Sequence, residues 1–248
     1  MISLVLIVNK QEIYKDFLDN LDTQEEIEYE IVPIFNYNNE YRSARQAYNN
    51  ATKKINGDVL IFMHPDIRFL HKHSLKNFVE SIHSIKDAGV IGVAGARASK
   101  DKPSVGDILS GIVHGLDKRE LGTVQIKKTE EVQTVDECMF AVNKKYFLEH
   151  PFSDLSGWHL YAVDYCLEAL KNSRKNYVVP SQIWHISDGV SLDEKYVEQV
   201  EIIIKKWRDY YNVIYTTIKT WPTKGVYAYI YRKYYWIKQR IKRMIMRR

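Results

Sequence analysis

The chain has 248 residues, of which 45% are hydrophobic and 27% are charged, with a formal net charge of +5 at pH 7. This length and composition exclude a disordered or fibrous chain and are typical of a globular protein with a sizeable core. We expect no signal peptide, because the first residues lack a basic start, and no membrane-spanning segment, because no apolar run is long enough. Cys138 and Cys166 lie in apolar runs, which favours buried thiols in a reducing cytoplasm over a disulfide.

The positive charge is concentrated near the C-terminus. No acidic residue follows Asp209, whereas ten of the 36 basic residues lie between Lys219 and Arg248. The other 26 basic residues face 31 acidic ones, so the rest of the chain is net negative. A basic tail on an acidic body indicates a separate role for the tail. We therefore predict a main domain of residues 1–212 and a helical tail of residues 213–248.

The first 63 residues alternate between strand and helix patterns. Apolar runs predict strands at 2–8, 29–35 and 59–63, and three-four apolar spacing predicts helices at 11–21 and 41–55. This alternation is typical of a doubly wound, mostly parallel α/β sheet, and such halves commonly bind nucleotides.

Less regular patterns follow in the second part of the chain. We predict helices at 75–85, 160–171 and 193–211, and strands at 90–95, 131–142 and 176–179. Residues 98–121 are polar, contain glycine and show little periodicity, so we expect a functional or mobile loop there.

The strand predicted at 59–63 is an unbroken apolar run, which indicates burial on both faces. Pro65 ends it, because proline cannot donate to a sheet, and so His64 and Asp66 fall at its carboxyl end. Ligands of open α/β sheets bind at that edge, which favours a functional site. The alternative is a turn in which Asp66 caps a helix that begins near His71.

Other polar residues also stand at predicted strand ends or helix starts, and together they predict one site assembled from several loops. They are Asp136, Glu137, His159, Asp164 and His185. A hard divalent cation prefers oxygen ligands and Mn²⁺ accepts imidazole, so Asp66 and His185 are candidate metal ligands. The alternative for His185 is a local hydrogen bond at a strand end. The adjacent Trp184 and the polar turn at residues 187–189, whose backbone can accept phosphate, favour the site.

Two acidic positions leave their roles open. Asp164 lies in the first turn of its predicted helix, where the helix dipole favours a carboxylate whatever its role. If the side chain points into the cleft, it is a candidate general base. Asp136 and Glu137 are adjacent, so at most one of them can face the cleft from a strand.

Five short motifs fall at these element boundaries in a fixed order. They are Ala44-Arg45-Gln46-Ala47-Tyr48-Asn49, Phe62-Met63-His64-Pro65-Asp66, Val135-Asp136-Glu137, Trp158 to Cys166, and Trp184 to Gly189. In this order they resemble glycosyltransferases of the GT-A fold, close to family 2. The resemblance is narrower to a bacterial glycosyltransferase-like branch, in which the metal motif reads His-x-Asp in place of Asp-x-Asp.

The resemblance implies a Rossmann-like GT-A domain that transfers a sugar from a nucleotide-sugar donor to a glycan or lipid-linked acceptor, with Mn²⁺ or Mg²⁺ as cofactor. It places Asn9 and Asn36 near base and ribose, with Arg45 assisting and His64 near the ribose or the metal. It makes Asp66 and His185 metal ligands, and it makes Asp164 the base of an inverting reaction. Acceptor contacts or supporting roles are left to Asp136, Glu137, Trp158 and His159.

The sequence departs from the family pattern at two of these positions. A histidine at position 64 removes one negative charge, which would weaken metal affinity. Asn36 stands where many family 2 members carry an acid, which leaves recognition of the base open.

The tail at 221–248 has apolar or aromatic residues at three-four spacing, with Lys and Arg on its other faces. These residues are Tyr227, Ile230, Tyr234, Ile237, Ile241 and Met244. A basic amphipathic helix of this kind is typical of an anionic membrane surface, and the expected location is the inner face of the cytoplasmic membrane. The alternative is a helix packed on the body with a solvated basic face. No nucleic-acid partner is expected, because no nucleic-acid motif accompanies the basic stretch.

Two other functions compete with a glycosyltransferase. A nucleotidyltransferase of similar fold would offer a triphosphate more basic residues near the first loop, which carries only Lys10. A non-catalytic protein would bind a nucleotide or glycan and dock to a membrane or partner through its basic tail.

Overall fold

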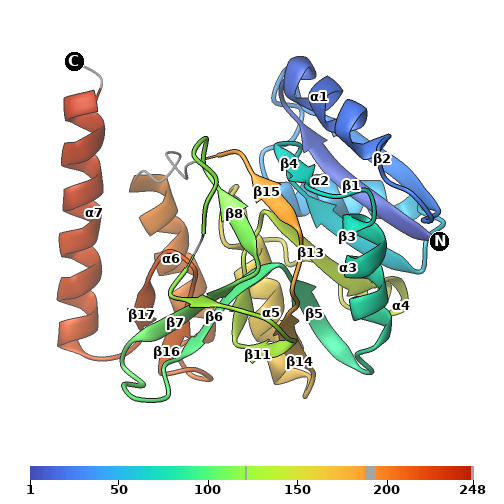
Figure 1. The fold of residues 1–248 in the computed structure, drawn as a ribbon. Coiled ribbons are helices and arrows are strands. Elements are labelled where there is room, and N and C mark those ends of the chain that lie inside the picture. Colours follow the sequence, from blue (N-terminus) through green and yellow to red (C-terminus); the bar gives the residue numbers. More distant parts are fainter. Residues whose placement is uncertain (121, 188–193, 247–248) are drawn as a thin grey trace.

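The structure, a computed structural model, describes residues 1–120, 122–187 and 194–246. Its centre is a seven-stranded mixed sheet with the strand order β11-β14-β5-β13-β3-β1-β2 (Figure 1). The strands are β1 (Ile2–Val8), β2 (Tyr29–Phe35), β3 (Val59–Met63), β5 (Ala88–Gly92), β11 (Glu130–Val132), β13 (Met139–Asn143) and β14 (Lys175–Val178). β1 is parallel to both β2 and β3, whereas β13 is antiparallel to β3 and β5.

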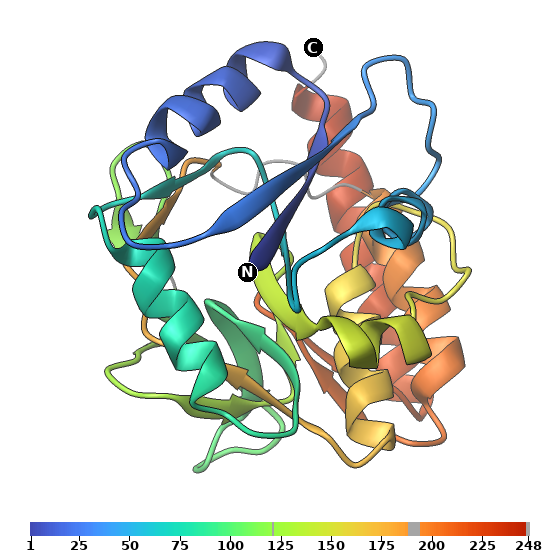
Figure 2. The same ribbon diagram turned by 90° about the vertical axis from the view of Figure 1, so that its right-hand side faces the viewer.

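Helices cover both faces of this sheet, with α1 and α3 on the left and α2, α4 and α5 on the right in Figure 2. The helices are α1 (Gln11–Leu21), α2 (Ala44–Ala51), α3 (Ser74–His83), α4 (Lys144–Glu149), α5 (Tyr161–Lys171), α6 (Glu194–Trp207) and α7 (Val226–Met246), with a 3₁₀ turn at Thr52–Lys54. Alternate residues of β3 face opposite layers: Phe62 packs with Tyr48 of α2, and Ile61 lies in the core that contains Phe78 of α3. Burial on both faces is therefore the reason for the unbroken apolar run.

Smaller sheets form in the segments that connect the elements of the central sheet. One has the order β10-β7-β6-β12 and another the order β4-β15-β8-β9, while β16 and β17 form a hairpin. Their strands are β4 (Ile67–Phe69), β6 (Ala94–Ala98), β7 (Gly106–Ser110), β8 (Ile112–His114), β9 (Arg119–Glu120), β10 (Val124–Gln125), β12 (Thr134–Val135), β15 (Ile183–His185), β16 (Val213–Tyr215) and β17 (Thr220–Pro222).

The predicted α/β fold is confirmed, and β1, α1, β2 and β3 have the predicted bounds. The loop expected at 98–121 is wrong, because β7, β8 and β9 lie there. β7 pairs with β6, and β8 pairs with β15, which is distant in the sequence. Because these strands depend on pairing with other segments, the local sequence pattern does not reveal them. The strand predicted at 131–142 is instead three strands with bends between them, and the six-residue α4 was not predicted.

The C-terminal part begins with a hairpin that belongs to the body. Gln133 Nε2 donates to the Val213 carbonyl at 3.0 Å, and Thr134 Oγ1 donates to the Tyr215 carbonyl at 2.5 Å. Residues 213–222, which the predicted boundary assigns to the tail, are thus bonded to the main sheet region. α7 lies beside α6 at the edge of the molecule (Figure 1). None of the helices in the described residues is both long and apolar enough to cross a membrane.

Candidate active site

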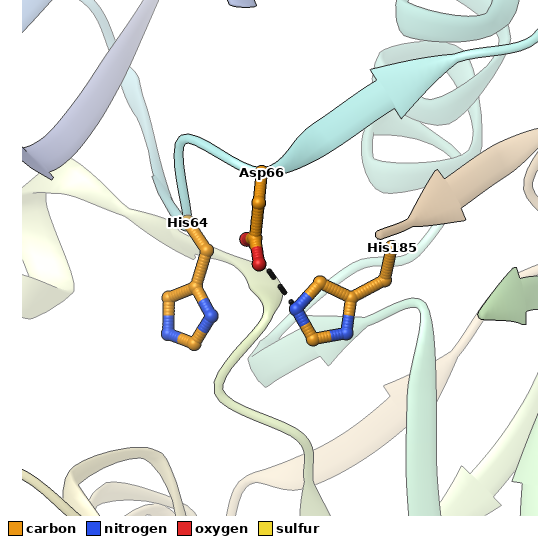
Figure 3. Close-up of side chains that lie close together, drawn as sticks. All are labelled: His64, Asp66 and His185. Carbon is orange, nitrogen blue, oxygen red and sulfur yellow. Dashed lines mark ion pairs between the residues drawn. The ribbon is translucent and has the colours of Figure 1, made fainter. Parts of the chain in front are cut away.

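Three side chains converge at the carboxyl end of β3. His64 follows β3 directly, Asp66 precedes β4, and His185 ends β15. β4 and β15 pair antiparallel with His185 opposite Ile67, and the Ile186 N–H donates to the Asp66 carbonyl at 3.1 Å. Ligand atoms of the three side chains lie within 4.8 Å of one another, and in Figure 3 the Asp66 carboxylate lies between the two imidazoles. Asp66 does not cap α3, whose N-cap is His73, so the capping alternative is wrong.

The donor set of this cluster fits a divalent cation. Asp66 Oδ1 and His185 Nε2 are 3.4 Å apart and buried, yet neither forms a hydrogen bond of acceptable geometry with a described residue. His64 Nε2 has the Tyr161 hydroxyl at 3.3 Å. A carboxylate with two imidazoles is a ligand set that Mn²⁺ and related cations accept, and a cation would give the two orphaned atoms a partner.

Burial and the charges of neighbouring groups shift the pKa values of the three side chains in this cluster. Burial lowers the pKa of His64, so its imidazole is neutral. Burial alone would lower the pKa of His185, but the Asp66 carboxylate outweighs it and the pKa is raised. Burial alone would raise the pKa of Asp66, but His185 outweighs it and the pKa is lowered. A cation must therefore displace the proton that His185 holds at low pH.

His64 and Asp66 of the cluster line a pocket of about 450 Å³, which we call the main pocket. It is lined by Ile7, Asn9, Lys10, Ile13, Ala44, Tyr48, His64, Pro65, Asp66, Trp158 and Tyr161. Its size and largely apolar walls are those of a small-molecule site. Four of the predicted site residues line it, namely Asn9, His64, Asp66 and Trp158. Lys10, Tyr48 and Tyr161 also line the pocket but were not predicted as site residues. The position of Lys10 just after β1 could have indicated it, whereas the two tyrosines lie in helical patterns that indicate core residues.

A short turn before α5 carries Trp158 into this lining. Gly157 has φ +106° and Leu160 has φ +59°, both in the left-handed region. The Gly157 carbonyl accepts the Ala44 N–H at 3.3 Å, and Arg45 Nη2 donates to the Leu160 carbonyl at 3.0 Å. The turn is thus fastened to the start of α2, which places the indole opposite β1 and His64.

Asp164 does not face the pocket. It is 3% exposed, and its carboxylate accepts hydrogen bonds from Lys206 Nζ at 2.8 Å, Trp207 Nε1 at 2.7 Å and Ser153 Oγ. Arg45 Nε lies 3.7 Å from it. The predicted role as general base required the side chain to point into the cleft, and the structure does not meet that condition. Asp164 instead joins α5 to α2 and α6.

Arg45 and Asn36 are also placed away from the pocket lining. Arg45 is 1% exposed, and its guanidinium donates to the Leu160 carbonyl and pairs with the Asp164 carboxylate. Asn36 is 3% exposed, and its side-chain oxygen accepts the Tyr41 N–H at 2.9 Å, which shapes the turn after β2. Neither side chain contacts the cavity in which we expected a nucleotide, so the direct contacts predicted for them are not supported.

Asp136 and Glu137 lie in a bend between β12 and β13 rather than within a strand, so the opposite-face argument does not apply. Asp136 accepts the Cys138 N–H at 2.9 Å and a hydrogen bond from Thr217. Glu137 accepts the Tyr161 N–H at 2.6 Å at the start of α5. Burial, together with the Asp136 charge, raises the pKa of Glu137 to about 8. Neither Asp136 nor Glu137 is among the residues that line the pocket.

Two predicted elements complete the set. The His159 ring packs edge-on against Tyr196 at 5.6 Å between centroids and is not part of the lining. Of the polar turn at residues 187–189, positions 188 and 189 lie outside the described residues.

A Rossmann-like sheet with a small-molecule pocket and a His/Asp cluster at the carboxyl end of β3 is typical of α/β proteins that bind a ligand at that edge of the sheet. The sequence profile of a family described as "Glycosyltransferase like family" matches residues 3–207, and the chain belongs to that family. A comparison with curated protein sequences finds no match.

Solved structures share the fold. The S. aureus TarS structure (residues 1–349) in complex with UDP-GlcNAc is 15% identical with a TM-score of 0.56, covering 83% of this chain and 66% of that one. The mannosyltransferase PcManGT from Pyrobaculum calidifontis, in complex with GDP-Man and Mn²⁺, is 10% identical with a TM-score of 0.58, covering 84% and 63%. This chain therefore spans less than two thirds of either protein. At these identities the likeness establishes the GT-A fold alone.

Proposed function

We propose that the protein is a metal-dependent glycosyltransferase that moves a sugar from a nucleotide-sugar donor to a glycan or lipid-linked acceptor. The observation that carries this proposal is the convergence of His64, Asp66 and His185 within 4.8 Å at the edge of the main pocket. Family membership and the GT-A fold support the same reaction class.

The donor would lie in the main pocket, with its diphosphate at the cluster. Asn9 and Lys10 follow β1 and offer an amide and an ammonium group to the nucleotide, while Trp158 offers a flat apolar face. One of the similar structures is a complex with UDP-GlcNAc and another is a complex with GDP-Man, so uridine and guanosine donors are the first to test.

Asp66, His185 and His64 would hold Mn²⁺ or Mg²⁺. A bound cation would neutralise the leaving diphosphate as a Lewis acid. Two residues of the chain would assist. Lys10 would add positive charge beside the diphosphate, and the Tyr161 hydroxyl would orient His64. Among the described lining residues only Asp66 carries a carboxylate. An inverting course therefore needs a proton acceptor other than Asp164, and analysis of the product anomer would establish the stereochemistry.

The nucleotidyltransferase alternative is weakened, because Lys10 is the only basic side chain in the described lining. A non-catalytic binding protein remains the second candidate, since burial of Asp164 leaves the pocket without a carboxylate base. A binding protein would bind the nucleotide in the presence of metal. It would neither transfer the sugar nor slowly hydrolyse the donor.

The first experiment is calorimetry of the protein with UDP, GDP and their sugar derivatives, with and without Mn²⁺, for wild type and Asp66→Asn. We expect one nucleotide to bind only with Mn²⁺, and we expect Asp66→Asn to lower its affinity at least a hundredfold, because a charged ligand is lost. Chelation of the metal should reproduce the effect of the substitution.

Asp58→Asn is the matched control, because Asp58 is an exposed aspartate at the other end of the same strand. It should bind nucleotide like wild type. Metal-independent binding, or equal losses in both variants, would refute the metal site. Labelled-sugar transfer to glycan or lipid-linked acceptors would then separate the enzyme from the binding protein.

A further inference from the structure

Helix α7 presents an apolar stripe to solvent. The stripe consists of Tyr227, Ile230, Tyr234, Ile237, Ile241 and Met244, and these side chains are 47–72% exposed. We call these six residues the outer stripe. They are the residues whose three-four spacing marked the tail as amphipathic, and an amphipathic helix of a globular protein ordinarily turns such a stripe to its core.

The body-facing side of α7 is formed by other residues. Ala228, Arg232, Tyr235 and Gln239 are buried, and Arg232 Nε donates to Glu201 of α6 at 3.0 Å. At about 100° per residue, these positions lie on the side of the helix opposite the outer stripe. The packing of α7 on the body therefore uses Arg232, Gln239 and the aromatic Tyr235, and it leaves the six residues of the outer stripe uncovered.

Basic residues border the outer stripe on both sides. On a helical projection, Lys233 and Arg240 lie along one border, and Lys238 and Lys242 lie along the other. All four are exposed, and α7 contains no acidic residue. Long basic side chains beside an apolar stripe can reach phosphate groups while the stripe enters the acyl region, which is the geometry of a helix lying in a membrane interface.

A second copy of the chain fits this surface poorly. Two outer stripes in contact would bring lysine and arginine borders together without an acidic residue of α7 to pair them, and like charges in contact are destabilising. An anionic lipid surface supplies both the apolar phase and the negative charge that the helix lacks.

We infer that the outer stripe and its basic borders form a docking surface for an anionic phospholipid membrane. α7 would lie in the plane of that surface, with α6 and the body on its aqueous side (Figure 1). This inference stands apart from the proposed reaction, because docking requires neither donor nor metal.

Vesicle flotation of the full chain tests it, with phosphatidylcholine vesicles that contain or lack phosphatidylglycerol. We expect binding to the anionic vesicles only, weakened at high salt because charges are screened. Ile237→Gln/Ile241→Gln should weaken binding at least tenfold, because two exposed apolar anchors are lost. Lys238→Gln/Lys242→Gln should weaken it by about fivefold per residue.

Matched controls carry the same changes on exposed positions elsewhere. Val105→Gln/Leu148→Gln and Lys127→Gln/Lys145→Gln should bind vesicles like wild type, and circular dichroism should give all variants the same helix content. The inference is overturned by absence of binding to anionic vesicles or by equal losses in the controls. It is also overturned if light scattering finds a dimer that Ile237→Gln/Ile241→Gln dissociates, since a second copy would then occupy the stripe.

Discussion

Asp164 and Asp66 both stand at the boundary of a regular element, but their surroundings give them different roles. The Asp164 carboxylate is buried among Arg45, Lys206 and Trp207, so its charge is compensated within the protein. Asp66 lies at the main pocket, and its Oδ1 has no hydrogen bond to a described residue. A carboxylate whose charge is compensated within the protein stabilises the fold, whereas a carboxylate at a pocket with unused lone pairs can bind a ligand.

We predict that Asp164→Asn lowers the free energy of unfolding by about 3 kcal/mol, because it leaves the buried Arg45 guanidinium without its counter-charge. Thermal unfolding should report a fall in Tm of about 10 °C. Asp154→Asn, an exposed aspartate nearby in sequence, is the control and should melt like wild type.

Nucleotide binding by folded Asp164→Asn should remain, since the side chain does not line the pocket. An unchanged Tm together with abolished sugar transfer would contradict this assignment and would return Asp164 to the role of base.

Residue types were sufficient to predict which side chains could ligate a metal, but not which way each one points. His64, Asp66 and His185 were predicted at one site and lie together. The family resemblance placed Arg45 and Asn36 near the nucleotide, and Asp164 was a candidate base only if it faced the cleft, yet all three are buried outside the pocket lining. The orientations of Arg45 and Asp164 depend on neighbours from α6 and the turn before α5, which are distant in sequence.

At the scale of elements, the turn at residues 157–160 connects the fold to the pocket. Gly157 adopts φ +106°, which side-chain-bearing residues rarely adopt, and its neighbour Trp158 lines the cavity. A Cβ atom at Gly157 would lie 2.2 Å from Gln199 Oε1, but that amide is the end of a flexible side chain and can move. The main cost of a substitution is therefore the backbone rotation that would displace Trp158.

We predict that Gly157→Ala lowers nucleotide affinity by about tenfold and stability by about 1 kcal/mol. Gly225→Ala is the matched control, since Gly225 has φ +90° and no atom within 4 Å of a Cβ. It should lose similar stability and no affinity. Calorimetry with the nucleotide that wild type binds measures the first quantity, and urea unfolding measures the second. Equal affinity of both variants would show that the turn does not set the pocket.

For the whole molecule, α7 is attached to the body by aromatic packing of Tyr231, Tyr235 and Trp236 on the core around Trp221 and by several polar contacts. Arg232 is buried, and besides Glu201 it contacts the Pro222 carbonyl through Nη1 at 3.0 Å. Arg243 also pairs with Glu194 of α6.

Arg232→Ala should therefore loosen α7 while the body stays folded. We expect amide hydrogen exchange in 226–246 to become at least tenfold faster, since a charge-assisted hydrogen bond contributes about 1.5–3 kcal/mol. Lys233→Ala, the exposed neighbour, should leave exchange unchanged. Faster exchange throughout the sheet would instead mean that α7 is part of the body's cooperative unit.

The sequence by itself determined the elements whose signal is local. Apolar runs and three-four spacing located β1, α1, β2 and β3, and Pro65 located the strand end that carries His64 and Asp66. Five ordered motifs were enough to indicate the GT-A family, and the profile match over residues 3–207 agrees.

Only the tertiary structure decided which distant groups meet. Pairing of β4 with β15 brings His185 to Asp66, and packing of α6 against α5 turns Asp164 inward. Periodicity also could not tell which side of α7 faces the body. That side is decided by hydrogen bonds of Arg232 to Glu201 of α6 and to the Pro222 carbonyl of β17, and by the packing of Tyr235 on Trp221. Local patterns encode burial tendency, whereas contacts between distant segments fix the orientation of each side chain.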